Sequence, residues 1–259
     1  MTSPSAGAGV LLPGLLLLLL ISACRPKPSW DVLQLDDPAL PSASDAELSA
    51  CAASLELVGE RPKPAHHTNF GDRRRVDSLG RQVPHRPQLI VLHETVIPAD
   101  ATVRLFQTAH PKDEDQVSYH MLIDRDGRRL RIVPDERRAY GAGMAAFGDF
   151  TVRIRPESVG SINNVSLHLS LESPPDGLGD GNSHSGYTQA QYDAAAAQVL
   201  LWQARHGIPM SRLTTHRAVD RSHSRYDPRS FRWERFDAAY RQAASRCDLA
   251  SYDNGRATY

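Results

Sequence analysis

The stretch QLIVLH, residues 88–93, decides the fold. Its four consecutive aliphatic residues form the near-continuous apolar run that is expected of a central strand buried on both faces. The run ends in His93, whose ring a rigid strand would hold in a fixed orientation. On spacing alone, a histidine in this position is more often a structural residue than a metal ligand. The stretch therefore predicts a central strand and leaves the role of His93 open.

The segments that follow predict a sheet with helices. Residues 117–124 and 129–134 flank the sequence RDGR, a strong β-hairpin signal because Asp-Gly tolerates the positive φ of a tight turn. Residues 164–171 alternate between apolar and polar side chains, as in a strand. Helices are expected at 188–206 and 231–245. Because strands and helices do not alternate regularly, we expect an α/β fold with a mixed β-sheet flanked by helices.

The organisation of the chain is expected to be simple. The pattern predicts one domain over residues 88–245, followed by a C-terminal tail over 246–259. Residues 24–87 are rich in Pro, Ser, Asp and Arg and predict a tether with one short helix. That helix has a capping-box pattern, with Ser44 three residues before Glu47. The chain contains no internal repeats, and we expect a monomer.

The charge balance excludes one class of partner. The 259 residues include 30 Lys and Arg and 30 Asp and Glu, which give a formal net charge of zero. No strongly basic surface is implied, so we expect no nucleic acid as a partner.

The N-terminus predicts export and a lipid anchor. Residues 10–23 form an apolar run of signal-peptide length that ends in ISAC, which resembles a bacterial lipobox. We therefore expect residues 1–23 to be a lipoprotein signal peptide, and Cys24 to carry lipid and to attach the protein to a membrane. An ordinary signal peptide or a short membrane anchor is the alternative. Residue 25 is Arg, so the expected location is the cell envelope, at the outer membrane facing the periplasm.

Export also bears on the other two cysteines. Cys51 and Cys247 form an even pair in an oxidising compartment, so they could form a disulfide between the N-terminal arm and the C-terminus. Two buried thiols are an equally good interpretation.

Candidate metal ligands gather in LTTHRAVDRSHSRYDPRSF, residues 213–231. This stretch contains two histidines and two aspartates, and its composition is typical of a loop, in which spacing alone cannot select ligands. A catalytic zinc takes three protein ligands and leaves one position for water. The site therefore needs a ligand from elsewhere in the chain. Of the remaining histidines, His93 is the best candidate, because it lies at the end of a rigid strand.

Four segments carry a family resemblance, in this order: LIVLHET (89–95), VSYHMLIDRDG (117–127), NNVSLHLSLES (163–173) and THRAVDRSHSRYDPRSFRWERF (215–236). They resemble successive motifs of the zinc-dependent N-acetylmuramoyl-L-alanine amidases, the group that includes phage lysozyme amidases and peptidoglycan recognition proteins. The resemblance covers about residues 88–240. It implies the single-domain fold of that family and Zn2+ as the cofactor.

The resemblance also implies the ligand set. His93 matches the first zinc histidine of the family, His216 the second, and Asp227 the third ligand. Asp220 is then expected to support the loop, and His223 to lie outside the ligand set. A compact cluster of His216, Asp220 and His223 is the rival choice.

The catalytic positions depart from the family pattern. Bacterial members often carry a catalytic Glu where this chain has Ser170. Branches that lack this Glu carry a Tyr that matches Tyr119, so we expect Tyr119 to be catalytic. Glu172 lies on the same strand face as Ser170 and is the candidate for a substitute base.

Three further positions differ from the family. Arg225 stands where many members carry Lys, and it can stabilise an oxyanion but cannot act as an acid. Gly141 replaces a histidine of the family, so part of a substrate contact is expected to be missing. Pro228 is followed by Arg229, where the family prefers Gly.

Three other histidines lie outside the implied ligand set. His120 is expected to be structural. His168 could reach the cleft beside Ser170 or lie at the surface. His184 could contact substrate, but a plain loop residue is the simpler interpretation.

The implied function is hydrolysis by a zinc enzyme. It would cleave the amide between N-acetylmuramic acid and L-alanine in peptidoglycan or its muropeptide fragments. The alternative is a peptidoglycan-binding protein that keeps the fold and has lost turnover. The missing Glu and Lys favour this alternative, and the complete set of His93, His216 and Asp227 argues against it.

Overall fold

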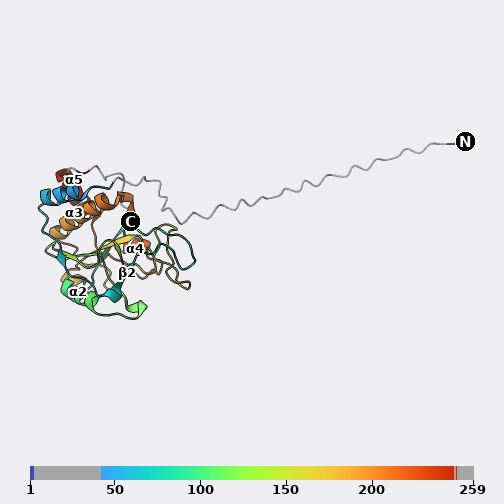
Figure 1. Cartoon of the computed structure of the whole chain (residues 1–259), viewed down its shortest axis with the longest axis horizontal. Helices are drawn as coiled ribbons and strands as arrows, with labels where there is room; N and C mark the ends of the chain where they lie inside the picture. Colours follow the sequence, from blue (N-terminus) through green and yellow to red (C-terminus); the bar gives the residue numbers. More distant parts are fainter. Residues whose placement is uncertain (3–41, 248, 250–259) are drawn as a thin grey trace.

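The computed structural model describes residues 1–2, 42–247 and 249 (Figure 1). One six-stranded sheet organises the fold. Its spatial order is β1 (Arg61–Pro62), β5 (Arg129–Arg131), β4 (Met121–Ile123), β7 (Ser166–Leu171), β3 (Leu89–Glu94) and β8 (Leu213–Thr215). A separate antiparallel pair joins β2 (Phe70–Asp72) and β6 (Arg137–Ala139).

The strand pairing confirms the mixed sheet. The strand β3 runs parallel to both of its neighbours, β7 and β8, and all six of its residues are buried. The neighbouring strands β4 and β5 are antiparallel and form the expected hairpin, in which Gly127 has a φ of +79°. The predicted central strand therefore lies inside the sheet, where both faces and both edges are covered.

Three helices cover one face of the sheet: α1 (Asp45–Ser54), α3 (Gln189–His206) and α5 (Trp233–Arg246) (Figure 1). The helix α3 begins with a capping box on Thr188 and ends at Gly207 in the left-handed conformation, as the sequence predicts. The apolar side chains of β7 point to this layer and are completely buried. Burial of this apolar surface holds the helices on the sheet.

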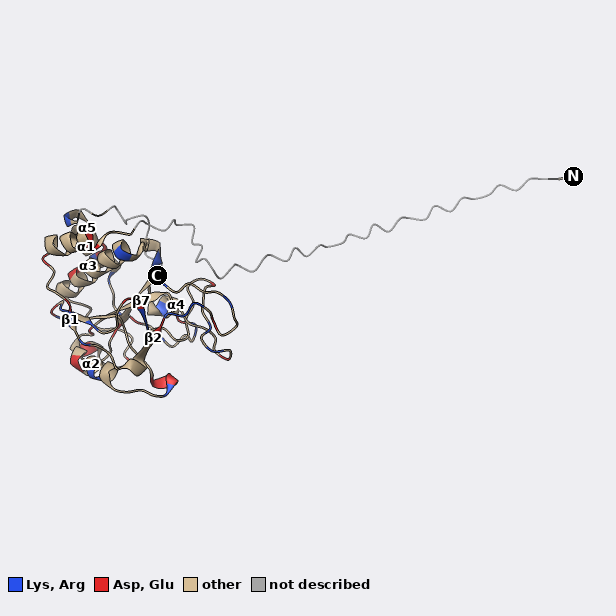
Figure 2. Ribbon diagram, in the orientation of Figure 1, with Lys and Arg blue, Asp and Glu red and all other residues tan. Residues whose placement is uncertain are grey.

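The opposite face carries the polar side chains of β7 and is covered by α2 (Ala99–Gln107) and by the segment 140–165. Short 3-10 turns lie at His67–Asn69, Asp113–Asp115, Pro175–Gly177 and Met210–Arg212. A short helix, α4 (His216–Val219), follows β8, in a stretch that the sequence predicts to be a loop. Lys and Arg are interspersed with Asp and Glu along the ribbon, in keeping with the neutral net charge (Figure 2).

Residues 42–87 differ from the expected tether. The strand β1 joins the main sheet beside β5, and β2 pairs with β6. Arg73 extends inward and donates hydrogen bonds to the backbone carbonyls of Asp135, Asn164 and Ser166. Because these contacts satisfy polar groups of the domain interior, this segment is part of the folded unit. The remainder of the expected tether, residues 24–41, and the signal peptide with Cys24 lie outside the described residues, apart from residues 1–2.

A disulfide joins Cys51 to Cys247, with the two Cα atoms 4.8 Å apart. It links α1 to the residue after α5, across a sequence separation of 196 residues. Of the two interpretations that the sequence left open, the structure has the paired cysteines. In the expected tail, Arg246 ends α5, and residues 248 and 250–259 lie outside the described residues.

Candidate metal centre

The three expected ligands come together at one end of the sheet. His93 lies near the carboxyl end of β3, and His216 is the first residue after β8. These strands are parallel neighbours, so their carboxyl ends meet at the same edge of the sheet. The side chain of Thr215 accepts a hydrogen bond from the Ala218 N–H and so fixes the start of α4, where His216 lies. Asp227 reaches the same place from the loop after α4.

The ligand atoms form a compact cluster in which all lie within 4.8 Å of one another. The Nδ1 of His93 is 3.2 Å from Asp227 Oδ2, and the Nδ1 of His216 is 3.1 Å from the same oxygen. Two ligand atoms that each lie about 2.0–2.1 Å from a tetrahedral zinc are separated by roughly 3.3 Å. The spacing and the chemistry of this donor set therefore fit a zinc ion.

Burial prepares the same groups to bind a cation. Desolvation lowers the pKa of His93 to about 4, which leaves its imidazole neutral at pH 7. Burial acts to raise the pKa of Asp227, but its hydrogen bonds to His216 and His93 outweigh that effect and hold the pKa well below the ordinary value. A neutral imidazole and an ionised carboxylate are the forms that coordinate metals.

The rival cluster does not form. The carboxylate of Asp220 accepts hydrogen bonds from the backbone N–H groups of Ser222, Ser224 and Arg225, so it supports the loop. His223 is exposed and has a φ of +55°. In the described part of the chain, the single group of three or more side chains that could hold a metal is the one formed by His93, His216 and Asp227.

Tyr119 lies against the centre. Its ring stacks on His93, with ring centroids 4.6 Å apart and an interplanar angle of 27°. Desolvation, together with the negative charge of Asp227, raises the pKa of the Tyr119 phenol well above its ordinary value. The phenol therefore stays protonated at neutral pH and can donate a hydrogen bond.

Arg225 lies at the solvent-exposed side of the centre. Its positive charge acts to lower the pKa of both His93 and Tyr119, which places the guanidinium within electrostatic reach of both groups. An exposed cation beside the metal ligands is suitably located to meet a negative charge on a substrate.

Glu172 is engaged elsewhere. One carboxylate oxygen accepts the backbone N–H of Ala99, at the start of α2, and the other accepts that of Arg125. These bonds favour a structural role over the expected role as a substitute base. Ser170 is completely buried on the strand next to His93, and its hydroxyl has no hydrogen-bond partner among the described residues.

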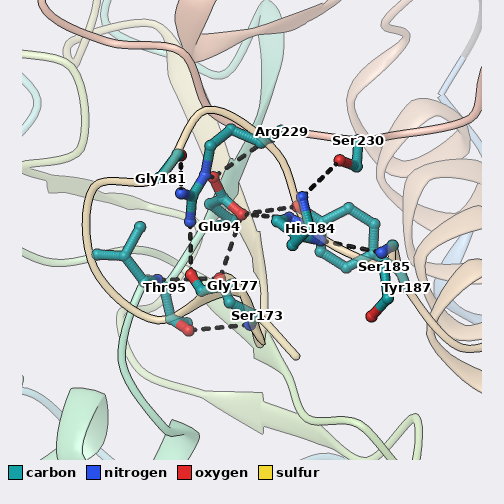
Figure 3. A network of polar contacts seen from close by, with 12 residues as sticks. Glu94, Thr95, Ser173, Gly177, Gly181, His184, Ser185, Tyr187, Arg229 and Ser230 are labelled. Atoms are coloured by element: carbon teal, nitrogen blue, oxygen red, sulfur yellow. Dashed lines mark hydrogen bonds and ion pairs between the residues drawn. The ribbon is translucent and has the colours of Figure 1, made fainter. Parts of the chain in front are cut away.

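A buried network behind the centre is the feature that the sequence did not indicate (Figure 3). Glu94 follows His93 in β3, and its carboxylate forms an ion pair with Arg229 at 2.5 Å. The same carboxylate accepts hydrogen bonds from Ser173 and Tyr187. In the sequence, Arg229 stands out only as a departure from the Gly that the family prefers after Pro228.

The network fixes the long polar loop 173–187 beside the ligands. The guanidinium of Arg229 donates to the backbone carbonyls of Gly177 and Gly181. His184 accepts the Gly186 N–H at Nδ1, so its Nε2 carries the proton that is donated to Glu94, at 2.9 Å. His184 is therefore a buried anchor of this loop (Figure 3).

The sequence is similar to those of known proteins. Residues 83–230 match the family model described as N-acetylmuramoyl-L-alanine amidase. The chain is 28% identical over 166 residues to the 1,6-anhydro-N-acetylmuramyl-L-alanine amidase AmpD of Citrobacter freundii, covering 59% of this chain and 80% of the relative. The match to AmpD of Escherichia coli K12 is also 28% identical, over 54% of this chain and 70% of the relative.

The fold is similar to that of a solved AmpD. A crystal structure of a selenomethionine derivative of AmpD superposes with a TM-score of 0.51 at 25% identity, covering 71% of this chain and 95% of that structure. The family match spans more than half of the chain and contains all three candidate ligands. The chain belongs to the N-acetylmuramoyl-L-alanine amidase family.

Proposed function

We propose that this protein is a zinc-dependent hydrolase that cleaves the amide between the lactyl group of N-acetylmuramic acid and L-alanine. The observation that carries the proposal is the convergence of His93, His216 and Asp227 within 4.8 Å, with His93 held neutral and Asp227 held ionised at neutral pH. Two neutral imidazoles and one carboxylate leave a site with zinc at a net charge of +1. Bound zinc supplies Lewis-acid chemistry, which polarises a carbonyl and makes water nucleophilic near neutral pH.

The side chains around the ligands take the remaining roles. The protonated phenol of Tyr119, stacked on His93, orients water or passes a proton to the leaving amine. The exposed guanidinium of Arg225 neutralises the oxyanion that develops on the scissile carbonyl. Because Glu172 is bound to two backbone amides, the proposal assigns it no proton transfer.

The substrate class follows from the relatives. The curated relatives are amidases named for 1,6-anhydro-N-acetylmuramyl-L-alanine. We infer that this chain acts on a muramyl peptide, either in intact peptidoglycan or in a released fragment. A panel with both kinds of substrate distinguishes these two sources.

The proposed location is the cell envelope. The sequence ISAC supports cleavage before Cys24 and lipid attachment there, with the folded unit facing the periplasm from the outer membrane. The disulfide between Cys51 and Cys247 fits an oxidising compartment. Within the described part of the chain, no helix is both long and apolar enough to cross a membrane.

The test is release of peptide from purified sacculi and from 1,6-anhydro-muropeptides. Hydrolysis should produce a new free amine on L-alanine, detected by mass spectrometry, and a chelator should abolish it. Asp227→Ala is the matched inactive control. Binding to sacculi without any release would instead support the alternative, a peptidoglycan-binding protein without turnover.

A further inference from the structure

The two ring nitrogens of His93 face different partners. Its Nδ1 points to Asp227 at the metal centre, and its Nε2 lies 2.9 Å from Nδ1 of His168. A neutral histidine that offers its Nδ1 lone pair to a metal carries its proton on Nε2. That proton needs an acceptor, because both rings are completely buried. His168 Nδ1 is the acceptor that the fold provides.

This arrangement leaves the other ring nitrogen of His168, Nε2, without a hydrogen-bond partner among the described residues. A neutral His168 that accepts at Nδ1 must carry its own proton on Nε2. That Nε2 is also buried. An unpartnered buried donor destabilises a fold, whereas an apolar side chain in the same place would not. The gain that offsets this cost is the hydrogen bond to His93.

The surroundings hold the His168 ring in place. It stacks on the ring of His120, with centroids 5.6 Å apart and an interplanar angle of 17°. The His120 Nδ1 accepts the backbone N–H of His168. At Gly141, an added Cβ would lie 2.7 Å from both Cγ and Nδ1 of His168. Any side chain at position 141 would therefore displace the atom that accepts from His93.

His168 is not a fourth ligand. Its Nδ1 contacts the edge of the His93 ring that faces away from Asp227, and His168 is not part of the three-residue ligand cluster. We infer that His168 is a positioning residue for the metal centre. It fixes the tautomer and the ring orientation in which His93 Nδ1 binds the metal, and Gly141 provides the space that it needs. The inference rests on the proposed function only in taking the bound metal to be zinc.

The test compares His168→Asn with His168→Leu in the whole purified chain. The Oδ1 of Asn can occupy the position of the histidine Nδ1 and accept the same hydrogen bond, whereas Leu has nearly the same shape and cannot. The readout is the zinc dissociation constant, measured by competition with a chromophoric chelator. His168→Leu should lower zinc affinity by about 10- to 100-fold, as is usual when the hydrogen-bond partner of a ligating histidine is lost. His168→Asn should stay close to the wild-type affinity.

A second pair of variants tests whether the His168 ring needs the space that Gly141 leaves beside it. Gly141→Ala should lower zinc affinity in the wild-type background because its Cβ displaces His168. In a His168→Ala background the ring is absent, so adding Gly141→Ala should have no further effect. Such non-additivity is expected for two residues that are in direct contact, as Gly141 and His168 are. Thermal unfolding of each metal-free variant shows whether it folds.

The possible results separate cleanly. The inference is overturned if folded His168→Leu binds zinc as tightly as the wild type, or if His168→Asn loses as much affinity as His168→Leu. Activity lost at unchanged zinc affinity would also overturn it, because His168 would then act on the substrate. A wild-type protein that binds zinc tightly and releases no peptide from any muramyl substrate would contradict the proposed function. It would leave the affinity comparison for His168 intact.

Discussion

Glu94 and Arg229 form a buried ion pair, with Arg229 Nε 2.5 Å from Glu94 Oε1, and each lies within two residues of a metal ligand. The pair therefore connects the end of β3, which carries His93, to the loop that carries Asp227. It also holds the loop 173–187 through the backbone carbonyls of Gly177 and Gly181. The side chain of Arg229 thus joins three segments that are distant in the sequence.

Breaking this pair from one side should destabilise the fold strongly. Arg229→Met leaves the Glu94 carboxylate buried without its cation, which is expected to lower the free energy of unfolding by about 3–5 kcal/mol. The double variant Glu94→Gln with Arg229→Met removes both charges and should cost less than Arg229→Met alone. Urea denaturation measures both. Equal losses in the two variants would mean that the uncompensated charge is not the main cost.

Metal content should follow the ligand set. The purified protein is expected to hold about one zinc per chain, since three ligands are in place. Asp227→Ala should lose both zinc and activity, whereas Asp220→Ala should keep zinc because its carboxylate contacts backbone amides of the loop. Elemental analysis of the zinc content of the two variants shows which aspartate is the ligand. Zinc retained in Asp227→Ala and lost in Asp220→Ala would contradict the assignment.

Local sequence signals predicted the parts of the fold that depend on neighbouring residues. The apolar run of β3 and the capping box of Thr188 on α3 act over a few residues, and the structure contains both elements. The ligand set came from the resemblance to the amidase family, because spacing within the loop could not choose between Asp220 and Asp227. The structure brings Asp227, and not Asp220, to the two histidines.

The features that the sequence did not predict depend on distant contacts. Glu94 and Arg229 are separated by 135 positions, and the sequence around each of them does not predict that its charge is buried. The segment 42–87 has the polar composition of a tether, yet Arg73 is satisfied by carbonyl groups more than 60 positions away. Such polar contacts form only when the tertiary fold brings the partners together. The polar composition of a segment therefore does not show whether its side chains are solvated or are hydrogen-bonded inside the fold.

The stability of the metal-free protein should fall on mild acidification. Desolvation lowers the folded pKa of His93 to about 4 and that of His120 to about 3, from the ordinary histidine pKa of 6.5. Between pH 6.5 and 4 the unfolded chain therefore binds more protons than the folded chain, so stability is full above pH 6.5 and is lost as the pH falls. We expect a loss of about 1–2 kcal/mol for each such histidine between pH 7 and pH 5.

A matched pair of variants isolates this effect. In the presence of a chelator, His120→Asn should reduce the change in unfolding free energy between pH 7 and pH 5. His223→Asn should not, because His223 is exposed. The carboxylates with lowered pKa values titrate below this window and do not contribute to it. An identical pH dependence in His120→Asn and the wild type would mean that His120 is not held neutral by burial.

Membrane attachment should depend on Cys24. The proposed lipid on Cys24 would bury methylene groups in the membrane at about 0.8 kcal/mol each, and more than one acyl chain would give stable attachment. Cys24→Ser should therefore move the protein from the detergent-extracted membrane fraction to a soluble or unprocessed form, as followed by cell fractionation and immunoblotting. A wild-type protein found wholly in the soluble periplasm would rule out the anchor.

The phenol of Tyr119 should be needed for turnover. The ring stacks on His93, and its raised pKa keeps the hydroxyl protonated, so it can donate a hydrogen bond or a proton in the reaction. Tyr119→Phe removes the hydroxyl and keeps the stacked ring. We expect kcat to fall by roughly 10²- to 10⁴-fold, the usual scale for a lost acid–base group, at unchanged zinc content and thermal stability.

Glu172→Gln is the control for this assignment, because Glu172 is the other side chain that could transfer a proton. Its carboxylate accepts the backbone N–H groups of Ala99 and Arg125, so the amide should weaken these contacts and lower stability while kcat changes little. Steady-state kinetics on a muramyl peptide, with melting temperatures for both variants, gives the comparison. A severe loss of kcat in Glu172→Gln with near-normal turnover in Tyr119→Phe would transfer the proton-transfer role to Glu172. Near-normal turnover in both variants would leave the metal centre and Arg225 to carry the reaction.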